Sequence, residues 1–133
     1  MNKIEHIGIA VQNLEKANLI YTQILGSEPY KTEQVASEKV MTSFFRCGES
    51  KIELLAATDE TSVIAGFIQK RGEGMHHIAF AVEDIEAEMN RLRQAGFTLL
   101  NETPKPGADN KLVCFVHPKS TNGVLIELCQ ERR

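Results

Sequence analysis

Two stretches of this sequence are near copies of each other, HIGIAVQNLE at residues 6–15 and HIAFAVEDIE at residues 77–86. Five of the ten aligned positions are identical. A second, shorter pair of similar segments comes later in the sequence. KIELL at residues 51–55 follows the first copy, and LIELC at residues 125–129 follows the second. Repeated segments in a constant order indicate a duplicated structural unit, so the sequence predicts two related halves.

The spacing within the two halves is nearly the same. His6 precedes Glu53 by 47 residues, and His77 precedes Glu127 by 50 residues. Because one short match can arise by chance but two in register rarely do, we interpret the four residues as two equivalent pairs. We expect the halves to pack on each other around a pseudo-twofold axis.

Length and composition are those of one folded domain. The chain has 133 residues, of which 42% are hydrophobic and 25% charged, with a formal net charge of −3. Neither half, about 1–70 or 71–133, is long enough to be stable alone, so we expect a single domain over residues 1–133. The weak negative charge argues against nucleic-acid binding, and apolar runs of about five residues are too short to span a membrane.

Each half is predicted to run strand, helix, then further strands. Asn13 and Asp84 lie near the ends of the repeated stretches and can cap helices that end near Gly26 and Gly96. A short helix is expected over residues 62–70, and the segment 102–110, with two prolines and a glycine, is expected to be a loop. The other predicted strands cover residues 40–45, 50–55, 112–117 and 123–129.

The repeated histidines share their strand faces with very small side chains. His6 lies on the same face as Gly8, and His77 on the same face as Ala79, because alternate residues of a strand point the same way. A purely structural core face is normally filled to high density by larger residues. Small neighbours leave room beside each imidazole.

Glu53 and Glu127 interrupt apolar strands, and burying an unpaired carboxylate is costly. A bound cation is one partner that offsets this cost. Two imidazoles and two carboxylates suit a divalent first-row metal ion, with two octahedral positions left for water or substrate. The sequence therefore predicts metal ligands at His6, Glu53, His77 and Glu127; taken singly, a strand histidine is usually hydrogen-bonded core and a strand glutamate usually faces solvent.

The remaining reactive residue types have ordinary structural explanations. His76 points to the opposite side of its strand from His77, and His117 precedes a proline in a turn. Three cysteines without C-x-x-C spacing, Cys47, Cys114 and Cys129, are expected to be reduced thiols in a cytoplasmic protein.

Several blocks resemble the methylmalonyl-CoA epimerases of the vicinal oxygen chelate superfamily. The blocks are HIGIAV, IAGFIQK, GMHHIAFAV and HPKSTNGVLIELCQ, and the resemblance extends over nearly the whole chain. HIGIAV marks the superfamily in general, whereas the later blocks are more specific to the epimerases. The resemblance implies an α+β, glyoxalase-like fold, in which two βαβββ modules form a curved mixed sheet around a metal.

The resemblance also implies residue roles. His6, His77 and Glu127 match metal ligands of the family, and Glu53 falls where bacterial epimerases can have a glutamine ligand. Some members have a catalytic glutamate in the middle strand of the first half, where Thr42 stands here.

The implied reaction is proton transfer at the carbon between the thioester and carboxylate of methylmalonyl-CoA. The metal chelates both groups and stabilises the enolate. Because epimerisation needs a proton-transfer group on each face of the substrate, we hypothesise that Glu53 and Glu127 serve as catalytic groups as well as ligands. Co²⁺ is the expected ion, with Ni²⁺, Mn²⁺ or Zn²⁺ as alternatives, and the expected partners are a small acyl-CoA substrate and a second copy of the chain, with no nucleic acid and no membrane.

Two other functions are compatible with the sequence. Glyoxalase I (lactoylglutathione lyase) has the same His, Glu, His, Glu arrangement at its metal, although the IAGFIQK and HPKSTNG blocks favour an epimerase. Metal-free antibiotic-binding proteins share the superfamily's fold, but they usually lose the ligand residues that this chain retains.

Overall fold

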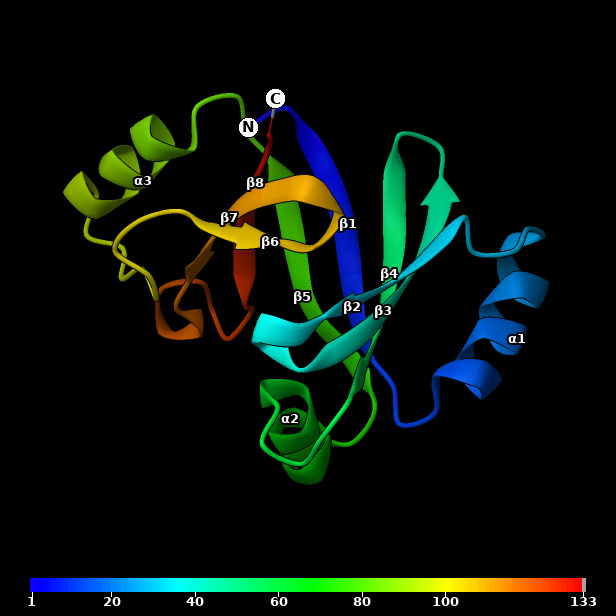
Figure 1. Cartoon of the computed structure of the whole chain (residues 1–133). Coiled ribbons are helices and arrows are strands. Elements are labelled where there is room, and N and C mark those ends of the chain that lie inside the picture. The colour runs from blue at the N-terminus through cyan, green and yellow to red at the C-terminus, as the bar shows by residue number, and fades with distance from the viewer. Residues whose placement is uncertain (133) are drawn as a thin grey trace. The chain divides into compact units, whose positions relative to one another are not determined.

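The computed structural model describes residues 1–132 and contains, over that range, eight strands, three α-helices and three short 3-10 helices (Figure 1). The chain divides into two compact units. Residues 6–76 form the unit that we call the first module. Residues 1–5, together with the chain from residue 77 onward, form the second module. The prediction of one domain over the whole chain stays a prediction.

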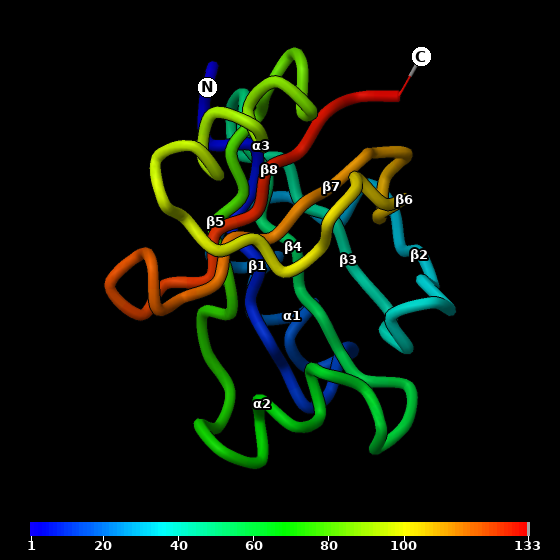
Figure 2. The backbone as a smooth tube through the Cα atoms, turned by 90° about the vertical axis from the view of Figure 1, so that its left-hand side faces the viewer, coloured from blue at the N-terminus to red at the C-terminus, as the bar shows by residue number. Residues whose placement is uncertain are grey.

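The first module is a four-stranded sheet in the order β2-β3-β4-β1. Strand β3 runs antiparallel to both β2 and β4, and β1 runs parallel to β4. The three antiparallel strands can be followed from cyan β2 to green β4 in Figure 2. The elements are β1 (Lys3–Ala10), α1 (Leu14–Leu25), β2 (Lys31–Val35), β3 (Val40–Cys47), β4 (Ser50–Ala57) and α2 (Val63–Arg71).

The second module repeats this topology in the order β6-β7-β8-β5. Strand β7 is antiparallel to β6 and β8, and β5 is parallel to β8. The predicted α+β class and the βαβββ element order of both halves are therefore confirmed. The elements are β5 (Gly74–Ala81), α3 (Ile85–Gln94), β6 (Lys105–Gly107), β7 (Lys111–Val116) and β8 (Ile126–Glu131).

The predicted helix boundaries are set by their caps. The side chain of Asn13 accepts a hydrogen bond from the Lys16 amide, and Gly26 ends α1 in the left-handed conformation at φ 75°. Asp84 caps α3 in the same way through the amide of Ala87, 3.1 Å away. Both α1 and α3 therefore start within the last two residues of the repeated stretch, directly after the capping residue.

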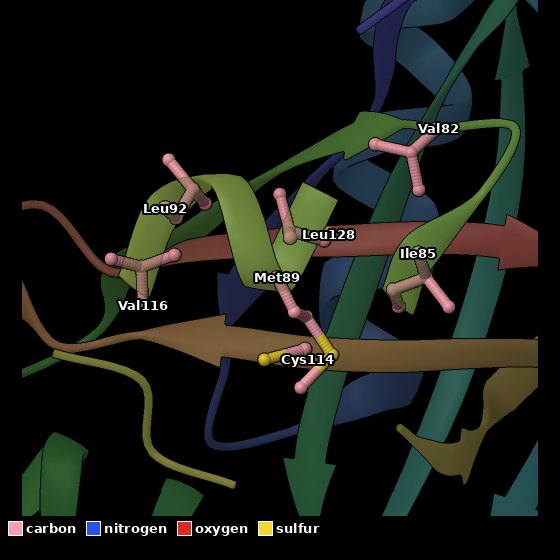
Figure 3. Packing of buried hydrophobic residues seen from close by; sticks show 7 residues of the cluster. All are labelled: Val82, Ile85, Met89, Leu92, Cys114, Val116 and Leu128. Carbon is pink, nitrogen blue, oxygen red and sulfur yellow. The ribbon is translucent and has the colours of Figure 1, made fainter. Parts of the chain in front are cut away.

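Each module buries one face of its sheet under its helix. In the first module α1 packs on Phe45, Leu54 and neighbouring residues of β3 and β4. In the second module α3 covers β7 and β8 through the cluster drawn in Figure 3, where Met89 points toward Cys114. Because α1 and α3 cover one face only, the histidine-bearing face of each sheet is left to other residues.

Three sequence predictions need correction. Strand β2 was not predicted, and the segment 102–110 is not a plain loop, because Lys105–Gly107 pairs with β7 as an edge strand. An edge position tolerates Pro106, since only one side of such a strand needs backbone donors. The last strand begins at Ile126 rather than at residue 123.

The cysteines are all free thiols, with Cys114 and Cys129 buried and Cys47 exposed. Burial raises the pKa of the Cys114 thiol, so this residue behaves as a small apolar side chain. Cys47 does not fit that description, because it lies at an exposed strand end. Over residues 1–132, no helix combines the length and apolar character that crossing a bilayer requires.

Candidate functional site

The first module brings His6 and Glu53 together. His6 lies on β1 and Glu53 on β4, and in the parallel register Glu53 stands beside Gly8. The Nδ1 atom of His6 is 3.1 Å from Oε2 of Glu53, and both side chains are 5% exposed. The two side chains that the sequence analysis grouped as one pair thus lie side by side, and their role as metal ligands stays a prediction.

The second module repeats the pair with His77 and Glu127. Glu127 on β8 stands beside Ala79 of β5, in the register that places Glu53 beside Gly8. The Nε2 atom of His77 is 3.1 Å from Oε1 of Glu127, and both side chains are buried. A small residue, Gly8 or Ala79, therefore stands beside the glutamate in each module.

Each pair also includes a phenylalanine that the sequence analysis missed. Phe44 of β3 stands opposite Glu53, and Phe115 of β7 stands opposite Glu127. The rings of Phe115 and His77 meet edge to face, with centroids 6.0 Å apart. Aromatic rings restrict the rotamers of adjacent side chains and exclude water, so they help to hold the pairs in place.

A lysine accompanies each phenylalanine. The ammonium group of Lys31 lies 5.1 Å from the ring centroid of Phe44, and that of Lys105 lies 5.5 Å from the centroid of Phe115. Both separations are within the range of a cation–π contact. The duplication therefore extends beyond the histidine and glutamate to a four-residue arrangement in each module, which consists of histidine, glutamate, phenylalanine and lysine.

The donor chemistry of the pairs suits a divalent cation. Two charged carboxylates in apolar strands are costly to bury without compensation, and neutral imidazole and carboxylate oxygen are common ligands of first-row metals. His6, Glu53, His77 and Glu127 are accordingly the residues that could hold a metal ion. The donor atoms present fit such an ion.

Other candidate residues have structural roles. The ring of His76 packs edge to face on Phe67, with centroids 4.9 Å apart. His117 accepts a hydrogen bond at Nδ1 from the Lys119 amide at 3.0 Å, which agrees with its predicted place in a turn. Thr42 is fully buried on the same strand face as Glu53, and its hydroxyl oxygen has no hydrogen-bond partner among the described residues.

Comparison with known proteins defines the class. Residues 5–115 match the Glyoxalase/Bleomycin resistance protein/Dioxygenase superfamily, which is the vicinal oxygen chelate group. The chain belongs to this superfamily, and its glyoxalase-like fold is thereby confirmed.

Within the superfamily the chain is similar to methylmalonyl-CoA epimerases. It is 42% identical over 132 residues to the ethylmalonyl-CoA/methylmalonyl-CoA epimerase of Cereibacter sphaeroides, covering 98% of both chains. A variant of the Streptomyces coelicolor methylmalonyl-CoA epimerase, solved in complex with 2-nitronate-propionyl-CoA, has a TM-score of 0.94 at 33% identity, covering 98% of this chain and 95% of the other. The resemblance predicted from the sequence blocks is confirmed.

A hypothetical protein of Bacillus halodurans is also similar in structure. Its TM-score is 0.96 at 43% identity, and the alignment covers 99% of this chain and 96% of that one.

Proposed function

We propose that this chain is a metal-dependent methylmalonyl-CoA epimerase. The observation that carries the proposal is the buried His–Glu pair, which occurs once in each module of a chain with epimerase relatives. Burying a carboxylate beside an imidazole carries an energetic cost in each module. Because the same costly pair occurs twice, we infer that it has a function rather than a purely structural role. We place the reaction in the cytoplasm, and we expect the chain to act as a homodimer.

The two pairs are proposed to hold one divalent metal ion through His6, Glu53, His77 and Glu127. Co²⁺ is the favoured ion, with Ni²⁺, Mn²⁺ or Zn²⁺ as alternatives. When bound, such an ion acts as a Lewis acid toward the thioester and carboxylate oxygens of the substrate.

The chain's own contribution to the reaction is proton transfer at C2 of the substrate. One glutamate, Glu53 or Glu127, accepts the C2 proton from one face, and the other donates a proton to the opposite face. The C–H bond that breaks is replaced by a new C–H bond of inverted configuration, so no oxidant or reductant is required. Glu53 and Glu127 suit this exchange, because each is a buried carboxylate held in place by its strand, and a positioned carboxylate can act as a general base or acid.

The proposal is tested by proton NMR of methylmalonyl-CoA in D₂O with Co²⁺-loaded protein. We expect the C2 proton signal to disappear as deuterium is incorporated, with interconversion of the two epimers. Absence of exchange at every metal tried would overturn the epimerase assignment.

The same preparation separates the alternatives. Turnover of the hemithioacetal of glutathione and methylglyoxal, without C2 exchange of methylmalonyl-CoA, would identify a glyoxalase I. A protein whose thermal stability is indifferent to Co²⁺, Ni²⁺ and Mn²⁺, and which catalyses neither reaction, would instead be a binding protein.

A further inference from the structure

One buried hydroxyl of the first module lies on the face that carries the candidate site and is not paired by the fold. Thr42 of β3 is 0% exposed, and its Oγ1 atom has no hydrogen-bond partner among residues 1–132. Burying a hydroxyl without a hydrogen bond is costly, and most buried side-chain polar atoms are therefore paired. An exception beside a candidate active site indicates a hydroxyl that pairs with a ligand.

Thr42 lies one row along the sheet from the His6–Glu53 pair. In the β3–β4 ladder Phe44 stands opposite Glu53, and Thr42 stands opposite Leu55. Alternate residues of a strand share a face, so Thr42 points to the same side of the sheet as Phe44 and Glu53. Diagonal neighbours in an antiparallel pair, such as Thr42 and Glu53, are about 7–8 Å apart. One small ligand group can therefore contact both side chains.

The neighbours of Thr42 do not compete for its hydroxyl. Leu55, on one side, belongs to a buried apolar cluster that packs with α2. Glu33 of β2, on the other side, stands opposite Thr42, but its carboxylate is paired with the ammonium group of Lys31 at 3.3 Å. The hydroxyl can therefore donate its proton to a ligand group that lies next to Glu53.

The burial of Thr42 selects the end of the substrate that it can meet. The proposed substrate carries a bulky nucleotide thioester on one side of C2 and a small carboxylate on the other. Only the small end fits beside a residue that has no exposed surface. A carboxylate accepts several hydrogen bonds through its two oxygens, and a threonine hydroxyl supplies one donor.

We propose that the Thr42 hydroxyl donates a hydrogen bond to the free carboxylate of the substrate and so holds C2 against Glu53. The inference rests on the proposed function for the identity of the substrate. It makes Thr42 a substrate-binding residue that carries no proton to or from C2. The unpaired hydroxyl then lowers the stability of the free protein and raises its affinity for the substrate, as is common at functional sites.

Thr42→Val tests the proposal, because it removes the hydroxyl and keeps the branched shape of the side chain. We expect a higher urea midpoint than in the wild type, since an unpaired polar group leaves the interior. We also expect kcat/KM for methylmalonyl-CoA to fall by about 10- to 100-fold, through loss of a hydrogen bond to a charged group. Thr42→Ser keeps the hydroxyl and should stay close to the wild type in kcat/KM.

Ser43 supplies a matched control. Like Thr42, it is 0% exposed, and its hydroxyl oxygen has no partner within the described part of the chain. Because it is the next residue of β3, it points to the opposite face of the sheet, where Leu54, its neighbour on β4, packs under α1. Ser43→Ala should therefore leave kcat/KM unchanged.

Three results would overturn the proposal. A lower urea midpoint in Thr42→Val would show that the hydroxyl is already satisfied in the free protein. An unchanged kcat/KM in Thr42→Val would show that the substrate does not use the hydroxyl. An equal loss of activity in Ser43→Ala would assign the effect to β3 as a whole rather than to the face that carries Glu53.

Ligand-induced stabilisation separates this inference from the proposed function. Methylmalonyl-CoA should raise the thermal midpoint of the wild type more than that of Thr42→Val, and this shift does not depend on turnover. Wild-type protein that shows this difference but exchanges no C2 proton would keep Thr42 as a binding residue and refute the epimerase. An active epimerase in which Thr42→Val keeps the wild-type shift and kcat/KM would do the reverse.

Discussion

Glu53 and Glu127 are carboxylates at positions where a strand would ordinarily carry an apolar side chain. Each is buried and lies 3.1 Å from one histidine nitrogen. Each also stands beside a small residue on one neighbouring strand and opposite a phenylalanine on the other. The same environment therefore surrounds both glutamates. This equivalence suits the proposed reaction, which needs one proton-transfer group on each face of the substrate.

Replacing Glu53 by glutamine tests its role as a proton carrier. The amide keeps the size and one oxygen ligand of Glu53 but cannot accept a proton at neutral pH, so we expect turnover to fall by about 10²–10⁴-fold. Glu15→Gln is the control, since Glu15 is an exposed glutamate of α1 in the same module and lies outside the four-residue arrangement. Full epimerase turnover and full C2 exchange in Glu53→Gln would show that Glu53 carries no proton.

Thiol reactivity tests the burial of the cysteines. Cys47 is exposed, whereas Cys114 is buried and its pKa is raised by desolvation. A raised pKa leaves less thiolate at a given pH, so Cys114 should react with Ellman's reagent only after denaturation, and Cys47 should react in the native protein. The Cys47→Ser variant removes the fast phase if this is right; a fast phase that persists in that variant contradicts the assignment.

Among the elements, β7 pairs with the strand that carries Glu127 of the second pair. It carries Phe115, whose ring meets His77, and its outer edge is only partly covered by β6. The side chain of Asn101 covers part of the remainder, because its oxygen accepts from the Phe115 amide at 3.0 Å and its nitrogen donates to the Val113 carbonyl at 3.2 Å. Asn101 thus acts as a substitute for a neighbouring strand.

Asn101→Ala should accordingly destabilise the protein. The substitution leaves the Phe115 amide without its side-chain partner, which costs about 1–3 kcal/mol for a buried group. Urea denaturation measures the effect, with Asn90→Ala as the control, because Asn90 only accepts an exposed bond from Arg93. Equal midpoints for the two variants would contradict the role given to Asn101.

Gly107 of β6 offers a test of how closely β6 packs on β7. A Cβ atom added there would lie 2.9 Å from Cγ1 of Val113, which is buried, so Gly107→Ala should cost about 1–3 kcal/mol. A Cβ atom added at Gly66 in α2 would meet nothing within 4 Å. Gly66→Ala should therefore stabilise the helix by about 0.5–1 kcal/mol. If both substitutions change the urea midpoint in the same direction, the close packing of β6 on β7 is wrong.

At the scale of the whole molecule, the internal repeat made most of the fold predictable. The similarity of residues 6–15 to residues 77–86 located the first strand, the helix cap and the histidine of each half. Similar sequences form similar local structures, so a duplicated segment predicts the same elements twice. The prediction failed at β2 and β6, which occupy equivalent places in the two modules and are short edge strands whose formation depends on pairing with β3 and β7. Propensity alone cannot detect such strands.

The candidate site was predictable in part. The internal repeat singled out His6, Glu53, His77 and Glu127, whose role as metal ligands stays a prediction, but it did not single out Phe44 and Phe115. They lie at different distances in sequence from their glutamates, since the turns between the strands differ in length. Only the strand register reveals that both stand opposite a glutamate.

We propose that both His–Glu pairs bind one shared metal ion. Titration of metal-free protein with Co²⁺ by isothermal titration calorimetry tests it most directly, in the wild type and in the His6→Ala and His77→Ala variants. We predict one Co²⁺ per chain in the wild type and a loss of at least 100-fold in affinity in either variant (about 2.7 kcal/mol). Two Co²⁺ per chain, or tight binding that survives the loss of one histidine, would contradict the account.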